Sequence, residues 1–194
     1  MKTRIKLLSL LLMVVFASTA NISYAQEYKH FPAGSAKWDI IRCFSFYKPG
    51  WYDKYSITMD GTDTIYEGMT FKKLYVTIHH LPGTIHDTVY PAEFYGGLRE
   101  SDKQIYIYKA WLEPDPVVQL IYDFNQTNIG DTILTSALTG NPTRFRHLVT
   151  NVDSVLIGDQ YHKRLLLQDP DNINNFEYWI EGVGSSWGLT CATF

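Results

Sequence analysis

The chain has 194 residues with 17 Lys or Arg and 20 Asp or Glu, so its formal net charge is −3, and neither sign forms a run. This balance argues against nucleic acids and anionic membrane surfaces as partners. The length after residue 25 suits one domain with a substantial core, and we expect a single all-β domain over residues 26–194.

Residues 1–25 have the pattern of a secretory signal peptide. Basic residues precede an apolar run from Leu7 to Ala17, and Ser23-Tyr24-Ala25 offers small residues at both cleavage subsites. The apolar run is shorter than the roughly 20 residues that a membrane span requires. We therefore expect cleavage after Ala25 and a mature chain that starts at Gln26, contains no membrane span, and is exported to the periplasm, the cell surface or the exterior.

The mature chain interleaves its aromatic residues with Thr, Val and Ile, a pattern that favours strands. The sequence contains 14 Tyr, 10 Phe and 5 Trp, and no window shows a convincing amphipathic helix. Turn signals recur at a spacing of roughly 8 to 12 residues, which is typical of antiparallel sandwiches and barrels. The expected strands cover residues 38–47, 55–59, 64–66, 71–79, 84–90, 94–100, 104–111, 120–124, 129–132, 145–149, 152–157, 161–167 and 176–181.

Two local patterns lead to specific expectations. Asp60-Gly61 is expected to turn the chain between two short strands. Residues 120–124 and 129–132 are expected to form a strand, a tight turn and a second strand. In the longest expected strand, 71–79, Leu74 shares one face with Val76 and Ile78, so one face should be buried and the other wet.

The expected fold is all-β: a single antiparallel meander, closed or nearly closed as a barrel of the calycin kind, with a two-sheet β-sandwich as the alternative. Closure would remove unpaired strand edges. It would also bring the first strand beside the last, and Cys43 near Cys191. In an oxidising compartment these residues could form a disulfide, with two buried free thiols as the alternative.

Several motifs, taken in order, resemble those of a family of secreted Bacteroidetes proteins of unassigned function. The resemblance extends from about Trp38 to Gly188, and its motifs are Gly97-Leu98-Arg99-Glu100, Leu120-Ile121-Tyr122-Asp123-Phe124, Ile129-Gly130-Asp131-Thr132, Val152-Asp153-Ser154-Val155 and Trp179-Ile180-Glu181-Gly182-Val183-Gly184-Ser185. Members often carry a C-terminal sorting domain for secretion, which is missing from this sequence.

The same resemblance implies O-glycosylation, because Asp-(Ser/Thr)-apolar sequons accept O-linked glycans in that group. The matching hydroxyl residues are Thr64, Thr88, Thr132 and Ser154. A local interpretation also accounts for the repeat, since Asp favours turns and a β-branched Thr favours the strand that follows.

The sequence offers weak signals for catalysis. Residues 184–188 match the G-x-S-x-G elbow, but that motif requires a following helix and a later His and acid, so a Gly/Ser turn is the better interpretation. A glycoside hydrolase needs two opposed carboxylates, and the candidates are Glu100, Glu113, Glu177 and Glu181. The distance between two such carboxylates decides the mechanism, and the sequence does not give it. The histidines lack the spacing of a zinc site, and residues 123–134 depart from the pattern of a calcium-binding loop. No metal and no cofactor are therefore expected.

Exposed aromatic side chains can stack on sugar rings or peptides. The candidate ligand-binding residues are Tyr95, Tyr106, Tyr108 and Trp111, although such residues also fill barrel interiors. The function expected from these observations is a non-enzymatic binding or adhesion module of the cell envelope or exterior, whose partner is a glycan, an apolar small molecule or a cell-surface protein. A structural accessory domain and a hydrolase are the alternatives.

Overall fold

The computed structural model describes residues 26–43, 52–80, 89–110, 117–136, 144–186 and 188–189. In this part of the chain the regular structure is β-strand, which confirms the predicted all-β class. Within the same residues, no helix has the length and apolar character needed to cross a membrane. The strands are β1 Ser35–Cys43, β2 Tyr52–Tyr66, β3 Met69–His80, β4 Glu93–Ser101, β5 Gln104–Lys109, β6 Val118–Asp123, β7 Thr132–Ser136, β8 Arg144–Ile157, β9 Gln160–Asp169, β10 Asn172–Ile180 and β11 Gly184–Ser185.

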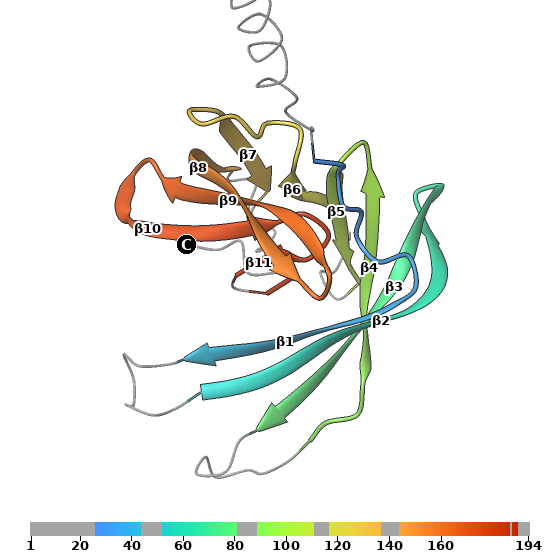
Figure 1. Cartoon of the computed structure of the whole chain (residues 1–194). Helices are drawn as coiled ribbons and strands as arrows, with labels where there is room; N and C mark the ends of the chain where they lie inside the picture. Colours follow the sequence, from blue (N-terminus) through green and yellow to red (C-terminus); the bar gives the residue numbers. More distant parts are fainter. Residues whose placement is uncertain are drawn as a thin grey trace, which may run out of the picture.

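The strands form two curled antiparallel sheets (Figure 1). The first sheet has the order β1-β2-β3-β4-β5-β6 and the second has the order β11-β10-β9-β8-β7, so hydrogen-bonded neighbours in each sheet are also neighbours in the chain. This arrangement fits both the barrel-like and the two-sheet descriptions expected from the sequence. The far ends of β1, β2 and β3 extend beyond the second sheet (Figure 1).

Alternation of side chains along each strand gives the first sheet two different faces. The inner face meets the second sheet and carries fully buried aliphatic residues such as Ile57, Leu74 and Ile107. The outer face carries their sequence neighbours, because successive residues of a strand point to opposite sides. The directions of the side chains alternate as expected for residues 71–79, with Leu74 on the inner face and Tyr75 on the outer face. The expected division into one buried and one wet face was wrong, because Ile78 of the inner face is 41% exposed where β3 extends beyond the second sheet (Figure 1), and Phe71 of the outer face is buried against Tyr108.

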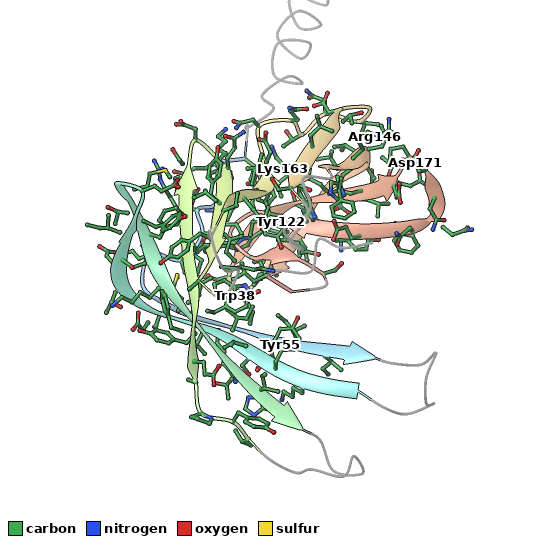
Figure 2. All side chains as sticks on the ribbon, turned by 180° about the vertical axis from the view of Figure 1, so that it is seen from behind. Trp38, Tyr55, Tyr122, Arg146, Lys163 and Asp171 are labelled. Atoms are coloured by element: carbon green, nitrogen blue, oxygen red, sulfur yellow. The ribbon has the colours of Figure 1, made fainter. Side chains whose placement is uncertain are left out.

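The space between the sheets is filled by side chains. Tyr122 of β6 lies near its centre (Figure 2) and meets Trp179 of β10 edge to face, with ring centroids 4.9 Å apart. The Tyr122 hydroxyl accepts a hydrogen bond from the Ser185 amide at 3.1 Å and donates to the Leu189 carbonyl at 2.8 Å. Burial of each large apolar side chain contributes about 1.5–3 kcal/mol. This single core therefore holds the two sheets together.

The connection between β6 and β7 differs from the expected hairpin. The two strands belong to different sheets, and residues 124–131 carry the chain from the first sheet to the second. Aspartate side chains accept hydrogen bonds from backbone amides of this segment. Asp123 accepts from the Asn125 amide at 2.9 Å, and Asp131 accepts from the Asn128 amide at 2.8 Å. At the end of the crossing, the backbone of Gly130 and Asp131 pairs with Val149 of β8. The hairpin prediction was wrong because strand partners are decided by the core and not by the turn sequence alone.

The expected turn at Asp60-Gly61 was also wrong, since β2 continues through it as one strand with a bulge. The register with β3 shifts between Met59 and Asp63. Gly61 has φ +82, a conformation that glycine adopts readily, and the Asp60 carboxylate accepts from the Thr62 amide at 2.9 Å. The Asp60-Gly61 sequence thus bends the long strand β2 and does not end it.

The first strand lies against the last described residues. The Trp38 indole donates to the Val183 carbonyl at 2.8 Å, and a Cβ built on Gly188 would lie 2.5 Å from Ile40 Cγ1. This contact joins β1 to the end of the second sheet. Cys43 ends β1, whereas Cys191 lies outside the described residues.

Candidate functional site

An extended N-terminal segment, residues 26–32, crosses both sheets, and we call it the strap. At its start the side-chain amide of Gln26 donates through Nε2 to the Tyr161 carbonyl at 2.5 Å and accepts through Oε1 from the Ser154 hydroxyl at 2.8 Å. Further along, the Phe31 ring is buried in the core and stacks on Tyr122 with centroids 6.0 Å apart. The strap is therefore part of the folded domain, although its sequence showed no strand pattern.

Two glutamates bind the backbone of the strap. Glu100 accepts from the Phe31 amide at 2.8 Å and lies 2.8 Å from His30 Nδ1. Glu181 accepts from the Lys29 amide at 3.3 Å and is almost fully buried. Burial raises the pKa of Glu181, while the hydrogen bond from Lys29 opposes that rise. Both carboxylates thus have a structural partner, which leaves neither placed as a free catalytic acid.

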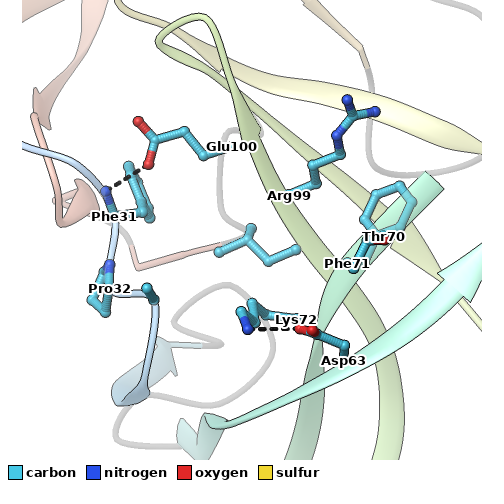
Figure 3. Close-up of a pocket in the computed structure, with 10 residues that line it drawn as sticks. Phe31, Pro32, Asp63, Thr70, Phe71, Lys72, Arg99 and Glu100 are labelled. Atoms are coloured by element: carbon cyan, nitrogen blue, oxygen red, sulfur yellow. Dashed lines mark hydrogen bonds and ion pairs between the residues drawn. The ribbon is translucent and has the colours of Figure 1, made fainter.

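Two shallow surface depressions flank the strap. One has a volume of about 210 Å³, lies between the strap and the first sheet, and is lined by Leu98 and by the Lys72–Asp63 ion pair (Figure 3). The other has a volume of about 410 Å³ and is lined by acidic residues and by Lys103. Within the described residues, no group of three or more His, Cys, Asp or Glu side chains is placed to hold a metal ion.

The aromatic residues expected to bind a ligand do not form one exposed platform. Tyr108 is buried on the outer face, where it stacks on Tyr66 at 4.7 Å and lies close to Gly97. Tyr106 is half-buried, and its hydroxyl donates to Gln104 at 2.6 Å. Tyr95 packs against the core. Trp111 lies outside the described residues.

A network of buried polar side chains lies on the inner face of the second sheet. Glu177 accepts from the Trp179 indole and from the Ser185 hydroxyl, each at 2.7 Å. His147 Nδ1 lies 3.5 Å from Glu177, and His147 Nε2 lies 3.0 Å from the Thr135 hydroxyl. Burial raises the pKa of Glu177 to about 7 and lowers the pKa of His147 to about 4.

A hydroxyl, an imidazole and a carboxylate in this order resemble a catalytic triad. However, each of Thr135, His147 and Glu177 is no more than 1% exposed, so a substrate cannot reach the hydroxyl. The arrangement therefore supports the packing of the second sheet. Glu113, the remaining carboxylate considered for hydrolysis, lies outside the described residues.

The other residues singled out from the sequence lie at separate places. Among the sequon hydroxyls, Thr132 is exposed at the start of β7, Ser154 holds Gln26, Thr64 lies near the Tyr108 hydroxyl at 3.4 Å, and Thr88 lies outside the described residues. The G-x-S-x-G stretch runs through β11, where the Ser186 hydroxyl accepts from the Tyr178 amide at 3.2 Å. That stretch is thus a strand followed by a turn within the residues described.

A different aromatic pair, which is partly exposed, lies on the outer face of the first sheet. Tyr75 of β3 is directly opposite Phe94 of β4, and their rings meet edge to face at 6.0 Å. Phe94 is 43% exposed. The sequence placed Tyr75 on the wet face of its strand, but the partner Phe94 depends on the register between strands, which periodicity does not reveal.

Three polar side chains lie beside this pair on the same face. Ser56 is directly opposite Asp39 in the β1–β2 register, and its hydroxyl lies 2.6 Å from the Asp39 carboxylate and 3.2 Å from His79 Nε2. A hydroxyl has one hydrogen and a carboxylate only accepts, so Ser56 donates to Asp39 and His79 Nε2–H donates to Ser56. We call Asp39, Ser56, Tyr75, His79 and Phe94 the outer-face patch.

The charge at the outer-face patch is fixed by these bonds. The hydrogen bond from Ser56, together with that from Lys37 at 3.0 Å, holds the pKa of Asp39 below its usual value. The Asp39 side chain is 47% exposed, whereas Ser56 is 1% exposed. Ser56 therefore positions Asp39 and His79, and its covered hydroxyl, which points to the carboxylate, is not arranged as a nucleophile.

Comparison with known proteins gives no match to a family model, to a curated protein or to a solved structure.

Proposed function

We propose that this protein is an exported, non-enzymatic binding or adhesion module that contacts its partner through the outer-face patch. The observation that carries the proposal is the partly exposed Tyr75–Phe94 pair beside an ionised, hydrogen-bonded Asp39. Half-exposed aromatic rings next to oriented polar groups are the composition of recognition surfaces. The filled interior between the sheets favours a partner that binds on the surface over an apolar molecule enclosed in the barrel.

Export is part of this proposal and rests on the N-terminal pattern. It places the module in the cell envelope or outside the cell, where binding partners are polysaccharides, lipids and surface proteins. Intact mass of the exported protein tests this part, and the expected chain starts at Gln26. Retention of residues 1–25 would overturn it.

Binding of the mature chain to cell-envelope fractions of the native host tests the function. Phe94→Ala removes the exposed ring, so we expect it to weaken binding about tenfold or more. Phe176→Ala is the matched control, because Phe176 is 54% exposed but belongs to the second sheet. Unchanged binding of Phe94→Ala, or equal losses in the two variants, would contradict a role for this face.

A further inference from the structure

We infer that the outer-face patch binds an extended glycan, with one sugar ring against the Tyr75–Phe94 pair and neighbouring hydroxyls hydrogen-bonded to Asp39 and His79. This inference rests on the function proposed above and narrows its partner to one chemical class. The patch combines an apolar surface with a polar one.

The aromatic pair supplies the apolar half of the site. A pyranose ring presents C–H groups on its faces, and these pack against the negative face of an aromatic ring. Tyr75 and Phe94 meet at an interplanar angle of 67°, so they present ring surfaces in two directions and form a corner instead of a flat stack. One sugar ring can lie in such a corner while its hydroxyls point away along the sheet.

The polar half of the site is already oriented. Asp39 is held ionised and accepts hydrogen bonds, which suits sugar hydroxyls as donors. His79 donates its Nε2–H to Ser56. In a neutral imidazole with its hydrogen on Nε2, the other nitrogen, Nδ1, is a hydrogen-bond acceptor. Because Ser56 fixes both groups, less side-chain entropy is lost on binding than at a free surface.

The spacing of the groups fits an elongated ligand. The patch runs across four neighbouring strands, β1 to β4, and adjacent strands lie about 4.8 Å apart, which gives a length of about 14 Å. Along β3, Tyr75 and His79 are separated by two pleats, or about 13 Å. A single small molecule would use one end of this surface, whereas consecutive sugar units can reach both the aromatic corner and the polar row.

A protein partner fits the patch less well. Protein-binding surfaces gather their large apolar residues into a desolvated centre. Here the row of the aromatic pair continues through Thr58 to Lys37, and the next row carries Asp39, Ser56 and Thr77, so polar groups interrupt the apolar surface. These groups would have to be desolvated against a protein, whereas hydroxyl groups of a glycan replace the water that they lose.

The test uses the mature full-length chain with two kinds of probe. The first is a panel of immobilised neutral oligosaccharides from disaccharides to hexasaccharides, and the second is the envelope fraction of the native host. The envelope fraction is divided into an untreated portion, a portion treated with periodate to cleave vicinal diols, and a portion treated with protease. We expect binding to oligosaccharides that rises with chain length, loss of envelope binding after periodate, and retention after protease.

Two variants and two matched controls connect that binding to the patch. Phe94→Ala and Asp39→Asn should each weaken binding about tenfold or more. Phe176→Ala in β10 and Asp171→Asn in the β9–β10 turn make the same changes away from the patch, and should leave binding unchanged; Asp171 pairs with Arg146 at 2.9 Å. Phe94→Leu keeps apolar volume without a ring and replaces Phe94→Ala if that variant fails to fold.

The outcomes separate this inference from the proposed function. Envelope binding that depends on Phe94, survives periodate and is lost after protease would overturn the glycan inference and leave the binding function standing. No binding to either probe, or binding insensitive to both patch variants, would overturn both.

Discussion

His147 Nδ1 lies 3.5 Å from Glu177 Oε1, and both side chains are fully shielded from solvent. Burial disfavours a charge on either group, so the pKa of Glu177 rises to about 7 and the pKa of His147 falls to about 4. Near pH 5.5 the unfolded chain therefore carries the proton on the histidine, and the folded chain carries it on the glutamate. Folding moves a proton within this pair without changing the number bound.

The first prediction is that Glu177→Gln changes how stability depends on pH. The Glu177 contribution is fully present below pH 4.5, the ordinary pKa, and is lost as the pH rises through about 7. Gln mimics the protonated form at every pH. The unfolding free energy of the wild type minus that of the variant should therefore rise by roughly 2–3 kcal/mol from pH 8 to pH 5.

Urea unfolding at both pH values measures that difference. The variant retains the opposite contribution of His147, which is present above pH 6.5 and lost as the pH falls toward about 4. Glu177→Gln should therefore lose stability on acidification, whereas in the wild type the opposite contributions of Glu177 and His147 nearly cancel. A difference between the two proteins that stays constant with pH would reject the raised pKa of Glu177.

The second prediction concerns the central hydroxyl. Tyr122→Phe removes the acceptor of the buried Ser185 amide and the donor to the Leu189 carbonyl, so the unfolding free energy should fall by about 1–3 kcal/mol. Tyr106→Phe removes a hydroxyl that bonds Gln104 on the partly exposed face and should cost about 0.5 kcal/mol or less. Urea midpoints that fall equally in the two variants would contradict the central role of Tyr122.

The third prediction is a disulfide between Cys43 and Cys191. Ile40 contacts Gly188, and each of these residues precedes one of the cysteines by a short segment of chain. A disulfide requires Cα atoms within about 7 Å. Denatured, unreduced mature protein should show no free thiol and a monomeric mass, and reduction should lower the unfolding free energy by as much as about 5 kcal/mol. Detection of both thiols would reject the bond.

The fourth prediction concerns the strap. Glu100→Ala leaves the Phe31 amide without its acceptor, so stability should fall by about 1–3 kcal/mol and trypsin should cleave faster after Lys29. Glu93→Ala is the control, because Glu93 is an exposed carboxylate on the same strand. Mass spectrometry of a digestion time course reports the cleavage. Equal cleavage rates in the wild type and Glu100→Ala would show that this carboxylate does not hold the strap.

The fifth prediction is O-glycosylation at Thr132, which is exposed at the start of β7. Protein from the native host should be heavier than protein from a host without the pathway, and Thr132→Ala should remove part of the excess mass. Thr127→Ala changes a nearby threonine that lacks a preceding Asp, and should remove none. Equal masses from the two hosts would reject the modification and support the turn-and-strand interpretation of the Asp-Thr repeat.

Sequence periodicity predicted most of the strands, because alternation records which residues face the core, as Leu74 and Tyr75 illustrate. The expected strand 129–132 is irregular before Thr132, where β7 begins, and most of the expected strand 84–90 lies outside the described residues. Periodicity did not predict strand partners. The Tyr75–Phe94 pair depends on the β3–β4 register, and the crossing between β6 and β7 depends on the second sheet, so both are set by tertiary packing. The burial of Glu177 could not be predicted from the sequence either, because glutamate is ordinarily exposed. The hydrogen-bond partners that make its burial possible come from two strands, β10 and β11.

The strap sets an order of events for the newly made chain. Within each sheet, hydrogen-bonded strands are sequence neighbours, so hairpins can form locally within about 1–10 microseconds. Gln26 instead meets Tyr161, which follows it by 135 residues. The strap is therefore made before β8 and β9 but can dock only after they have paired, so it is among the last segments to reach its final position. For the cleavage after Ala25 proposed above, this order means that the cutting enzyme meets an undocked segment.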